Sequence, residues 1–409
     1  MTMDLRPVPD APLHDAPNPW AGTDTPSRRD GPPYHMTEMI EAEPALAERL
    51  LRRLGDPDAA AAGLATELRA AAELSRPILV TGCGTSEHGA MATVEILREA
   101  LRAIGLPATQ GRTGTPVALQ AFEAALEDEL AGPGGLVIGI SHEGGTWATN
   151  RALERARTGR ARVALVTVSD RSPGAALADL VVSTGEADES WCHTVGYLSP
   201  ILAAIAVAGH LTSRPIRPDV ARSALAVGLD PAEVRRTEAL AESLAAMDRL
   251  LVAGSGSDRV AARELALKIE EGAHMPTVMR DLETVLHGHL AGTDTRTGLV
   301  VILADTSPDA EARGRRAAGV LRAASEIGIH SGAILAARYA ATIDPTLTPA
   351  GRLVVPAAPA LPAVVASLLG STVPLQLLTE RLARSRGIDP DPIRRDDARY
   401  RRAAEAAEG

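Results

Sequence analysis

Apolar runs and segments with helical spacing alternate along most of this chain. Four short runs in the first half have the continuous apolar character of strands buried on both faces: 78–80, 136–140, 163–168 and 180–182. Helical spacing follows at 89–105, 147–157 and 197–211. This alternation predicts a parallel sheet with helices on both of its faces.

The same alternation starts again after the segment 215–218. Strand-like runs recur at 250–253, 299–303, 332–335 and 353–355. Helical spacing covers 230–247, 259–273 and 364–384. The two halves, each about 180 residues long, therefore look like a distant duplication of one α/β unit. We place the first domain at 34–215, with leading helices at 36–54 and 60–74, and the second domain at 216–390.

Both ends of the chain fall outside these units. Residues 1–33 hold eight prolines and few apolar side chains. Such a segment cannot bury enough surface to offset the entropy cost of ordering its backbone. We predict a disordered tail there and a second tail at 391–409.

Composition and charge argue against several classes of protein. The chain of 409 residues is 45% hydrophobic, and its net charge of −10 is spread along the sequence, which disfavours nucleic acid or a membrane surface as a partner. No uninterrupted apolar run reaches the roughly 18 to 20 residues of a membrane helix, and the first residues lack the pattern of a signal peptide. Cys83 and Cys192 lack the spacing of a disulfide framework or a zinc site. We expect a cytoplasmic protein.

Two polar turns follow strand-like runs in the first half. Gly82–Ser86 comes after the run at 78–80, Ser141–Thr146 comes after the run at 136–140, and each opens a helical segment. Free backbone N–H groups, hydroxyls and the positive end of a helix together favour an anion. Neither turn completes a dinucleotide or ATP-binding motif. Phosphate or sugar binding is therefore favoured over nicotinamide or ATP chemistry, and we expect no cofactor.

The only lysine of the chain, Lys268, stands between two glutamates in a helical segment. Glu264, Lys268 and Glu271 are spaced i, i+4 and i+7, so they project from one stripe. Because every other long basic side chain is Arg, Lys268 is a candidate for a place that needs a compact, deprotonatable ammonium. A salt-bridged surface face is the plainer alternative. The apolar neighbours of the stripe favour a partly buried carboxylate that acts as a proton-transfer base.

The histidines that remain as candidates for catalytic or core roles are His142, His193, His274, His287 and His289. His287 and His289 could form a metal pair, yet no acidic or cysteine ligand stands at a supporting spacing. We therefore expect no metal site.

In their order along the chain, these motifs resemble the double sugar-isomerase (SIS) domain family, which includes the isomerase half of glucosamine-6-phosphate synthases and related phosphosugar isomerases and deaminases. The motifs that carry the resemblance are Gly82–Ser86, Ile140–Thr146, Glu264–Glu271, Leu286–Gly288 and Val373–Leu378. They lie within residues 35–394, nearly the whole chain outside the tail. The resemblance implies two tandem SIS domains, each a flavodoxin-like three-layer sandwich around a parallel sheet.

The resemblance also implies roles for individual residues. Sugar-phosphate contacts fall on the hydroxyls of the two turns and on a glutamate at the sugar end: Thr85, Ser86, Ser141, Thr146 and Glu189. His142, inside the second turn, is a further candidate for ligand contact. The glutamate that moves a proton between C1 and C2 falls on Glu271, its helical partner on Lys268, and the ring-opening histidine on His287. Because that histidine reaches a neighbouring subunit's site in the family, a homodimer is implied.

Three features depart from the family pattern. Glu143 stands where a phosphate-holding hydroxyl is expected, so either it turns away or the ligand's end is not a simple phosphate. The segment 393–399 replaces the family's C-terminal lysine motif with arginines, which cannot form an imine at neutral pH. No glutaminase domain precedes the isomerase part, so we do not expect glutamine-dependent amination by this chain alone.

These residues predict aldose–ketose isomerisation of a sugar phosphate by enediol proton transfer, with isomerisation or deamination of an amino-sugar phosphate as a variant. One alternative is a phosphosugar-binding or sensing protein without catalysis, and another is an isomerase for an unphosphorylated sugar. Such sensors normally carry a helix-turn-helix domain, for which residues 1–33 are too short. The joint presence of Lys268, Glu271 and His287 favours the enzyme.

Overall fold

The computed structural model describes residues 28–106, 108–109, 111, 113–308 and 310–408. These residues form two five-stranded sheets, in the orders β2-β1-β3-β4-β5 and β10-β9-β8-β6-β7. The strands of the first sheet are β1 (Ile78–Gly82), β2 (Pro116–Gln120), β3 (Leu136–Ile140), β4 (Arg162–Thr167) and β5 (Leu180–Ser183). Those of the second are β6 (Arg249–Ala253), β7 (Thr277–Arg280), β8 (Thr297–Leu303), β9 (His330–Ala336) and β10 (Gly351–Val355).

Helices precede, connect and follow the strands. In the first half they are α1 (His35–Leu54), α2 (Ala60–Glu73), α3 (Thr85–Ala103), α4 (Ala121–Leu126), α5 (Trp147–Thr158), η1 (Ala175–Leu177) and α6 (Val195–Thr212). In the second half they are α7 (Pro218–Ala226), η2 (Val227–Leu229), α8 (Pro231–Ala245), α9 (Asp258–Ala273), α10 (Leu282–Leu286), η3 (His289–Gly292), α11 (Ala310–Ile327), α12 (Ala337–Ala340), η4 (Pro345–Leu347), α13 (Ala363–Ser385) and α14 (Ala398–Glu408).

The two sheets have the same topology. All neighbouring strands pair in parallel. Within each half the first strand lies between the second and the third, so both sheets have the strand order 2-1-3-4-5. The predicted fold of two tandem α/β units is confirmed.

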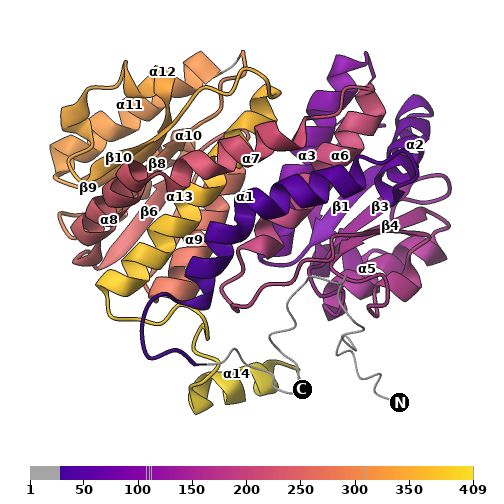
Figure 1. Cartoon of the computed structure of the whole chain (residues 1–409), viewed down its shortest axis with the longest axis horizontal. Helices are drawn as coiled ribbons and strands as arrows, with labels where there is room; N and C mark the ends of the chain where they lie inside the picture. Colours follow the sequence, from indigo (N-terminus) through magenta and orange to yellow (C-terminus); the bar gives the residue numbers. More distant parts are fainter. Residues whose placement is uncertain (1–27, 107, 110, 112, 309, 409) are drawn as a thin grey trace.

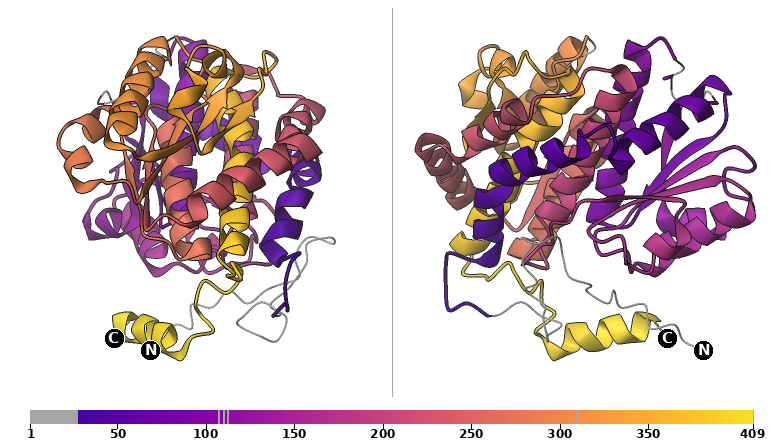
Figure 2. Two further views of the ribbon diagram at one scale, coloured as in Figure 1. Left: turned by 90° about the vertical axis from the view of Figure 1, so that its left-hand side faces the viewer. Right: turned by 45° about the vertical axis from the view of Figure 1, so that its right-hand side comes forward.

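The sequence pattern did not predict two of the strands or several of the helices. The sequence predicts four strands in each half, and the structure adds β2 and β7. Both are edge strands whose residues are mostly only half-buried or exposed, so they lack a continuous apolar run. Most of the predicted N-terminal tail, residues 1–27, lies outside the described residues. At the other end, the segment that we predicted as a tail contains α14, which lies apart from the main body (Figures 1 and 2).

The helices between the sheets join the two halves. α1 runs across both halves and contacts α6, α7 and α13 (Figure 1). One apolar core contains Leu198 of α6, Leu265 of α9 and Leu368 of α13. α6 and α13 are long and apolar enough to cross a membrane, but 83% of each apolar window is buried inside the molecule. That burial is typical of core helices in a folded domain. The two halves therefore share one apolar core.

Candidate active site

The two predicted turns lie at the point where the first sheet reverses its order of connection. β1 and β3 are neighbours, so residues 83–86 and 141–146 follow the carboxyl ends of adjacent strands. Ligands of open α/β sheets bind at such a switch point. Gly84 has φ +57°, and Gly144 has φ +68° with a Ser172 hydroxyl in the place of any Cβ. Ser141 donates a long hydrogen bond of 3.4 Å to the hydroxyl of Thr146. The second turn thus brings two of the predicted hydroxyls together.

The second half contributes a charged stripe on α9. Lys268 is fully buried, and its Nζ lies 2.5 Å from Oε2 of Glu271 and 3.8 Å from Oε1 of Glu264. Glu264 is fully buried as well, whereas the side chain of Glu271 is 23% exposed. The interpretation of the stripe as a solvated surface face is therefore wrong for Lys268 and Glu264. Glu271 is the member of the stripe with a carboxylate open to a ligand.

The surroundings of Lys268 favour its charged form. Burial acts to lower its pKa, but the charges of Glu271 and Glu264 outweigh burial and raise the pKa above the ordinary value. The ammonium is therefore retained at neutral pH. The raised pKa argues against a lysine that loses its proton at this position, because the buried cation lies beside two carboxylates. The ammonium pairs with the carboxylates of both neighbours.

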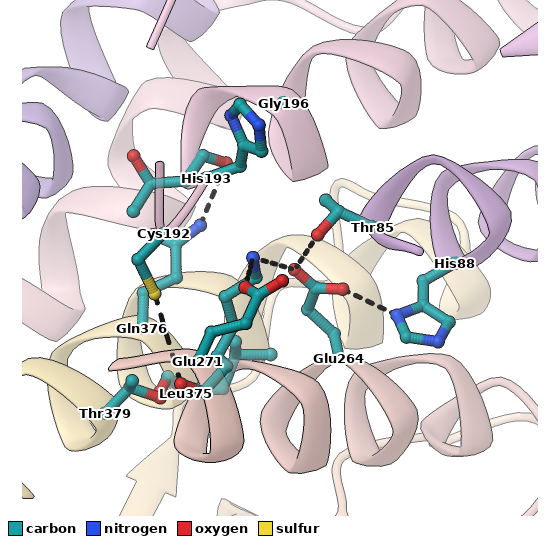
Figure 3. Close-up of polar contacts among 12 residues, drawn as sticks. Thr85, His88, Cys192, His193, Gly196, Glu264, Glu271, Leu375, Gln376 and Thr379 are labelled. Atoms are coloured by element: carbon teal, nitrogen blue, oxygen red, sulfur yellow. Dashed lines mark hydrogen bonds and ion pairs between the residues drawn. The ribbon is translucent and has the colours of Figure 1, made fainter. Parts of the chain in front are cut away.

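Two side chains of α3 hold Glu264 in place. Thr85 donates a hydrogen bond of 3.3 Å to Oε1 of Glu264, and Nδ1 of His88 lies 2.6 Å from Oε2 (Figure 3). The hydroxyl of Thr85, predicted to contact a sugar phosphate, is thus engaged by a carboxylate of the other half. His88 escaped the sequence analysis, because only the packing of α3 against α9 shows that it faces Glu264.

A network around Asp188 lies beside the second turn. The Asp188 carboxylate is 3.0 Å from Nδ1 of His193 and 3.4 Å from Nε2 of His142. His142 also accepts the backbone N–H of Asp188 at 3.1 Å. Burial lowers the pKa of His142, and Asp188 opposes this shift. His142, a predicted ligand contact, therefore points into this network. Asp188 was missed because it stands in a segment without regular secondary structure.

Glu189 points elsewhere, toward the start of α1. Its Oε2 lies 3.3 Å from Nδ1 of His35, and the same nitrogen lies 3.2 Å from Arg29. The Glu189 side chain is 23% exposed. The structure places it beside His35, and among the described residues it has no hydrogen bond or ion pair with the α9 stripe. A role at the sugar end remains a prediction.

His287 lies on the surface at the end of α10. Its side chain is 71% exposed, and Nε2 is 2.7 Å from Oε1 of Glu283. Within a single chain it makes no contact with Lys268 or Glu271 in the part that the structure describes. The residues of the predicted catalytic trio are therefore split between a buried stripe and an exposed loop.

The C-terminal segment runs next to the site. Asp391 accepts the backbone N–H groups of His35 and Met36, both at 2.9 Å, and its carbonyl accepts that of Trp191 at 3.0 Å. The guanidinium of Arg395 lies 3.5 Å above the ring of Trp191. Burial lowers the pKa of Arg395, and the charges of Glu143 and Glu271 oppose that shift. An arginine of the segment 393–399 is thus within electrostatic reach of both carboxylates.

Two clusters have donor atoms close enough for a metal among the described residues. One is His142, Asp188 and His193, and the other is His35, Glu38 and Glu189. In the first, His142 accepts a backbone N–H, and Oδ2 of Asp188 accepts the N–H of Gly196 at 2.7 Å. In the second, Arg29 donates to both oxygens of Glu38. These donor atoms are in use, so both clusters read as hydrogen-bond networks.

Comparison with known proteins places this arrangement in a family. No family model matches the chain. The chain is 30% identical over 302 residues to glutamine–fructose-6-phosphate aminotransferase [isomerizing] of Symbiobacterium thermophilum, an alignment that covers 69% of this chain and 46% of that protein. The chain thus spans about half the length of the curated relative that it matches.

Solved structures share the fold of the chain. The C-terminal domain of glucosamine-fructose-6-phosphate aminotransferase from Francisella tularensis superposes with a TM-score of 0.74 at 16% identity, covering 89% of this chain and 99% of that one. Tagatose-6-phosphate ketose/aldose isomerase from Escherichia coli gives 0.65 at 18% identity, with coverages of 88% and 95%. Glucosamine-6-phosphate deaminase from Thermotoga maritima gives 0.58 at 19% identity, with coverages of 87% and 96%.

The alignment, the order of the motifs and the two matching sheets agree with one another. The chain is a homologue of glutamine–fructose-6-phosphate aminotransferase and belongs to the double sugar-isomerase (SIS) domain family.

Proposed function

We propose that this protein is a sugar-phosphate aldose–ketose isomerase that works by proton transfer through an enediol. One observation carries the proposal. The partly exposed carboxylate of Glu271 lies 2.5 Å from a buried ammonium, on a helix that packs against the helix opened by the first turn. A carboxylate that stays ionised beside bound substrate is the group that such a reaction requires.

The residues divide the work between substrate binding and proton transfer. The hydroxyls of Ser86, Ser141 and Thr146, with the starts of α3 and α5, would hold the acidic end of the sugar. Glu271 would take the proton from C2 of the open-chain aldose and return it to C1. Lys268 would keep that carboxylate charged between turnovers.

One predicted role requires a second copy of the chain. His287 would open the sugar ring from the neighbouring subunit of a homodimer, which is consistent with its exposure in a single chain. Glu189 and His142 would complete the sugar end. We place the protein in the cytoplasm, without a nucleic-acid partner.

An amino-sugar phosphate is a second candidate substrate. The names of the relatives include an aminotransferase and a glucosamine-6-phosphate deaminase, which favours amino-sugar chemistry in this family. On such a substrate the same C2 proton transfer would accompany the release or uptake of ammonia. An assay of ammonia alongside isomerisation separates the two activities.

Glu143 favours an unphosphorylated sugar as the main alternative. A carboxylate in the second turn repels a phosphate, although the nearby cation of Arg395 reduces that repulsion. A phosphosugar-binding protein without turnover is the remaining alternative. It would keep the turns without any need for the proton-transfer pair.

Deuterium exchange tests the proposal. The protein is incubated in deuterated water with phosphorylated and unphosphorylated hexoses and hexosamines, and loss of the C2 proton signal is followed by NMR. We expect exchange with at least one phosphorylated sugar. Thermal stabilisation by a sugar phosphate without exchange from any sugar would contradict the enzyme and favour the binding protein.

A further inference from the structure

Asp188 is a buried carboxylate that accepts hydrogen bonds from the backbone at the start of α6. Its side chain is 1% exposed. Oδ1 accepts the backbone N–H groups of Thr194 and Val195 at 2.9 Å, and Oδ2 accepts that of Gly196 at 2.7 Å. Burial acts to raise its pKa, but hydrogen bonds and the charges of neighbouring histidines lower it well below the ordinary value. Asp188 therefore stays ionised inside the protein.

His193 is oriented by this carboxylate. Nδ1 lies 3.0 Å from Oδ2 of Asp188, which fixes the ring and leaves Nε2 at the opposite side. The ring is also in edge contact with His142 and Trp191, with centroids 5.2 Å and 6.3 Å apart. Among the described residues Nε2 has no hydrogen-bond partner, and the side chain is 23% exposed. One protonatable nitrogen is thus rigidly held and available to a ligand.

The surroundings of His193 favour its protonated form. Burial acts to lower its pKa, but the hydrogen bond and charge of Asp188 outweigh burial and raise it. Lys268 lowers the pKa and Glu143 raises it, so these two charges act on the ring from α9 and from the second turn. His142 is the other titratable group in contact with the ring.

The segment that carries His193 contacts α9, the helix of the proton-transfer pair. The preceding residue, Cys192, places its Sγ 4.0 Å from the backbone carbonyl of Lys268, in contact with α9 (Figure 3). The charge of Lys268 acts on the pKa of His193, so the ammonium lies within electrostatic reach of the ring. A histidine and a carboxylate that could act as acid and base are thus held by two different elements that contact each other.

We propose that His193 is a catalytic acid of this site, which donates the Nε2 proton to the carbonyl oxygen of the open-chain sugar, and that Asp188 is its positioning residue. The inference rests on the proposed function. As Glu271 removes the C2 proton, the Nε2–H bond breaks and an O–H bond forms on O1, which leaves a neutral enediol. Glu271 then returns its proton to C1, and neutral His193 takes the proton of the O2 hydroxyl. No proton is gained or lost overall, and His193 ends protonated.

This role is distinct from ring opening by His287. Ring opening requires an acid or base at the ring oxygen, whereas His193 would act afterwards on the carbonyl. It also lies within the same chain as Glu271, so it does not require a second subunit.

Three measurements test the inference. The first is NMR titration of the His193 ring in the whole protein, where we expect a pKa above that of free histidine, about 6.5. The second compares His193→Gln with the wild type in the exchange assay, where we expect a fall in kcat of about 100-fold with little change in KM. His330→Gln, in which a histidine bonded to Ser243 in the second half is replaced, is the matched control and should keep the wild-type rate. The third is the pH profile of Asp188→Asn, whose alkaline limb should move to lower pH, because His193 loses the carboxylate that raises its pKa.

Each contrary result is distinct. A His193 ring that titrates at or below the ordinary value overturns the inference without reference to activity. A wild-type enzyme that exchanges the C2 proton while His193→Gln keeps its rate and pH profile overturns this inference alone. Absence of exchange in the wild type overturns the proposed function and this inference together. Activity that follows added zinc and disappears with a chelator would make His142, Asp188 and His193 a metal site, and would also overturn it.

Discussion

The two halves of the molecule have one topology but differ at their switch points. In each half the first strand ends in a tight turn in which a glycine has positive φ, +57° at Gly84 and +70° at Gly256. Another glycine precedes it by two residues, and any Cβ there would lie within 3 Å of a backbone carbonyl, that of Ser86 beside Gly82 and that of Asp258 beside Gly254. By this correspondence Ser86 and Asp258 occupy equivalent positions.

In the second half the residue at this position, Asp258, bonds to a neighbouring loop and so closes the carboxyl edge of the sheet to a ligand. Asp258 is fully buried and accepts the backbone N–H groups of Ala304 and Asp305 in the loop after β8. It also accepts the hydroxyl of Ser367 at 2.7 Å. Arg313 fills the space beside Gly256 and pairs with Asp305 at 2.5 Å. Donors that would bind an anion in the first half are satisfied here by the protein itself.

This difference agrees with the proposal that the duplicated fold forms a single site. In the proposed function the turn of the second half binds no ligand, and its helix α9 brings Glu264, Lys268 and Glu271 to the first half, where Glu264 contacts Thr85 and His88. The first half supplies hydroxyls and helix starts, and the second supplies charge. The following variants test that division from the largest expected effect to the smallest.

Glu271→Gln should have the largest effect, because it removes the proposed proton carrier. We expect the rate of C2 exchange to fall by about 10³-fold, within the range for a general base, with a small change in KM. The matched control is Glu270→Gln, one residue away, whose side chain is exposed and caps the N–H of Thr277. If both variants lose activity equally, the assignment of Glu271 is wrong.

Lys268→Met should destabilise the link between the halves. It leaves the fully buried Glu264 without its cation, and removing one partner of a buried ion pair costs about 3 to 5 kcal/mol. The free energy of unfolding by urea measures the loss. The double variant Lys268→Met with Glu264→Gln should recover part of it. A single variant as stable as the wild type would show that the pair does not hold this edge together.

Ser86→Asp copies the second half's residue into the first and should close the open edge. We expect the affinity for a sugar phosphate, measured by calorimetry, to fall by more than about 100-fold, against about tenfold for Ser86→Ala. Ser257→Ala in the second half is the control and should leave the affinity unchanged. Equal binding by Ser86→Asp and the wild type would place the anion elsewhere.

Asp258 should make the free energy of unfolding depend on pH. Burial raises the pKa of its carboxyl from 3.8 to about 7, so the unfolded chain loses this proton at lower pH than the folded protein. Its contribution to stability is fully present below about pH 4 and is lost as the pH rises toward 7. Between pH 6 and 8 we expect a loss of about 1 kcal/mol in the wild type that Asp258→Asn does not show, measured by urea unfolding at both values. The same loss in both proteins would assign it to another group.

Much of the fold could be predicted from the pattern of apolar residues. β3 and β8 are buried along their whole length, so their residues form continuous apolar runs. The edge strands β2 and β7 do not, because one side of each has no neighbouring strand and the burial that marks a strand is incomplete. The order of the strands in each sheet depends on how the chain connects them, so the apolar pattern of a single segment does not predict it.

The site could be predicted where its residues share one element. Glu264, Lys268 and Glu271 follow from helical spacing alone. His88 and Asp188 could not be found in this way. His88 contacts Glu264, which lies 176 positions away in the sequence. Asp188 binds backbone N–H groups at the start of α6, and no spacing in the sequence shows such contacts. The charge state of Lys268 also depends on burial between two carboxylates, which spacing does not show.

A crystal structure with an unreactive sugar-alcohol phosphate is the most direct test of the claim that one edge of the molecule binds and transforms the ligand. We predict its phosphate at Ser86, Ser141 and Thr146, its carbon chain between Glu271 and His193, and an empty turn at 254–257. A ligand seated at the second-half turn, or with its carbon chain remote from Glu271, would contradict the account.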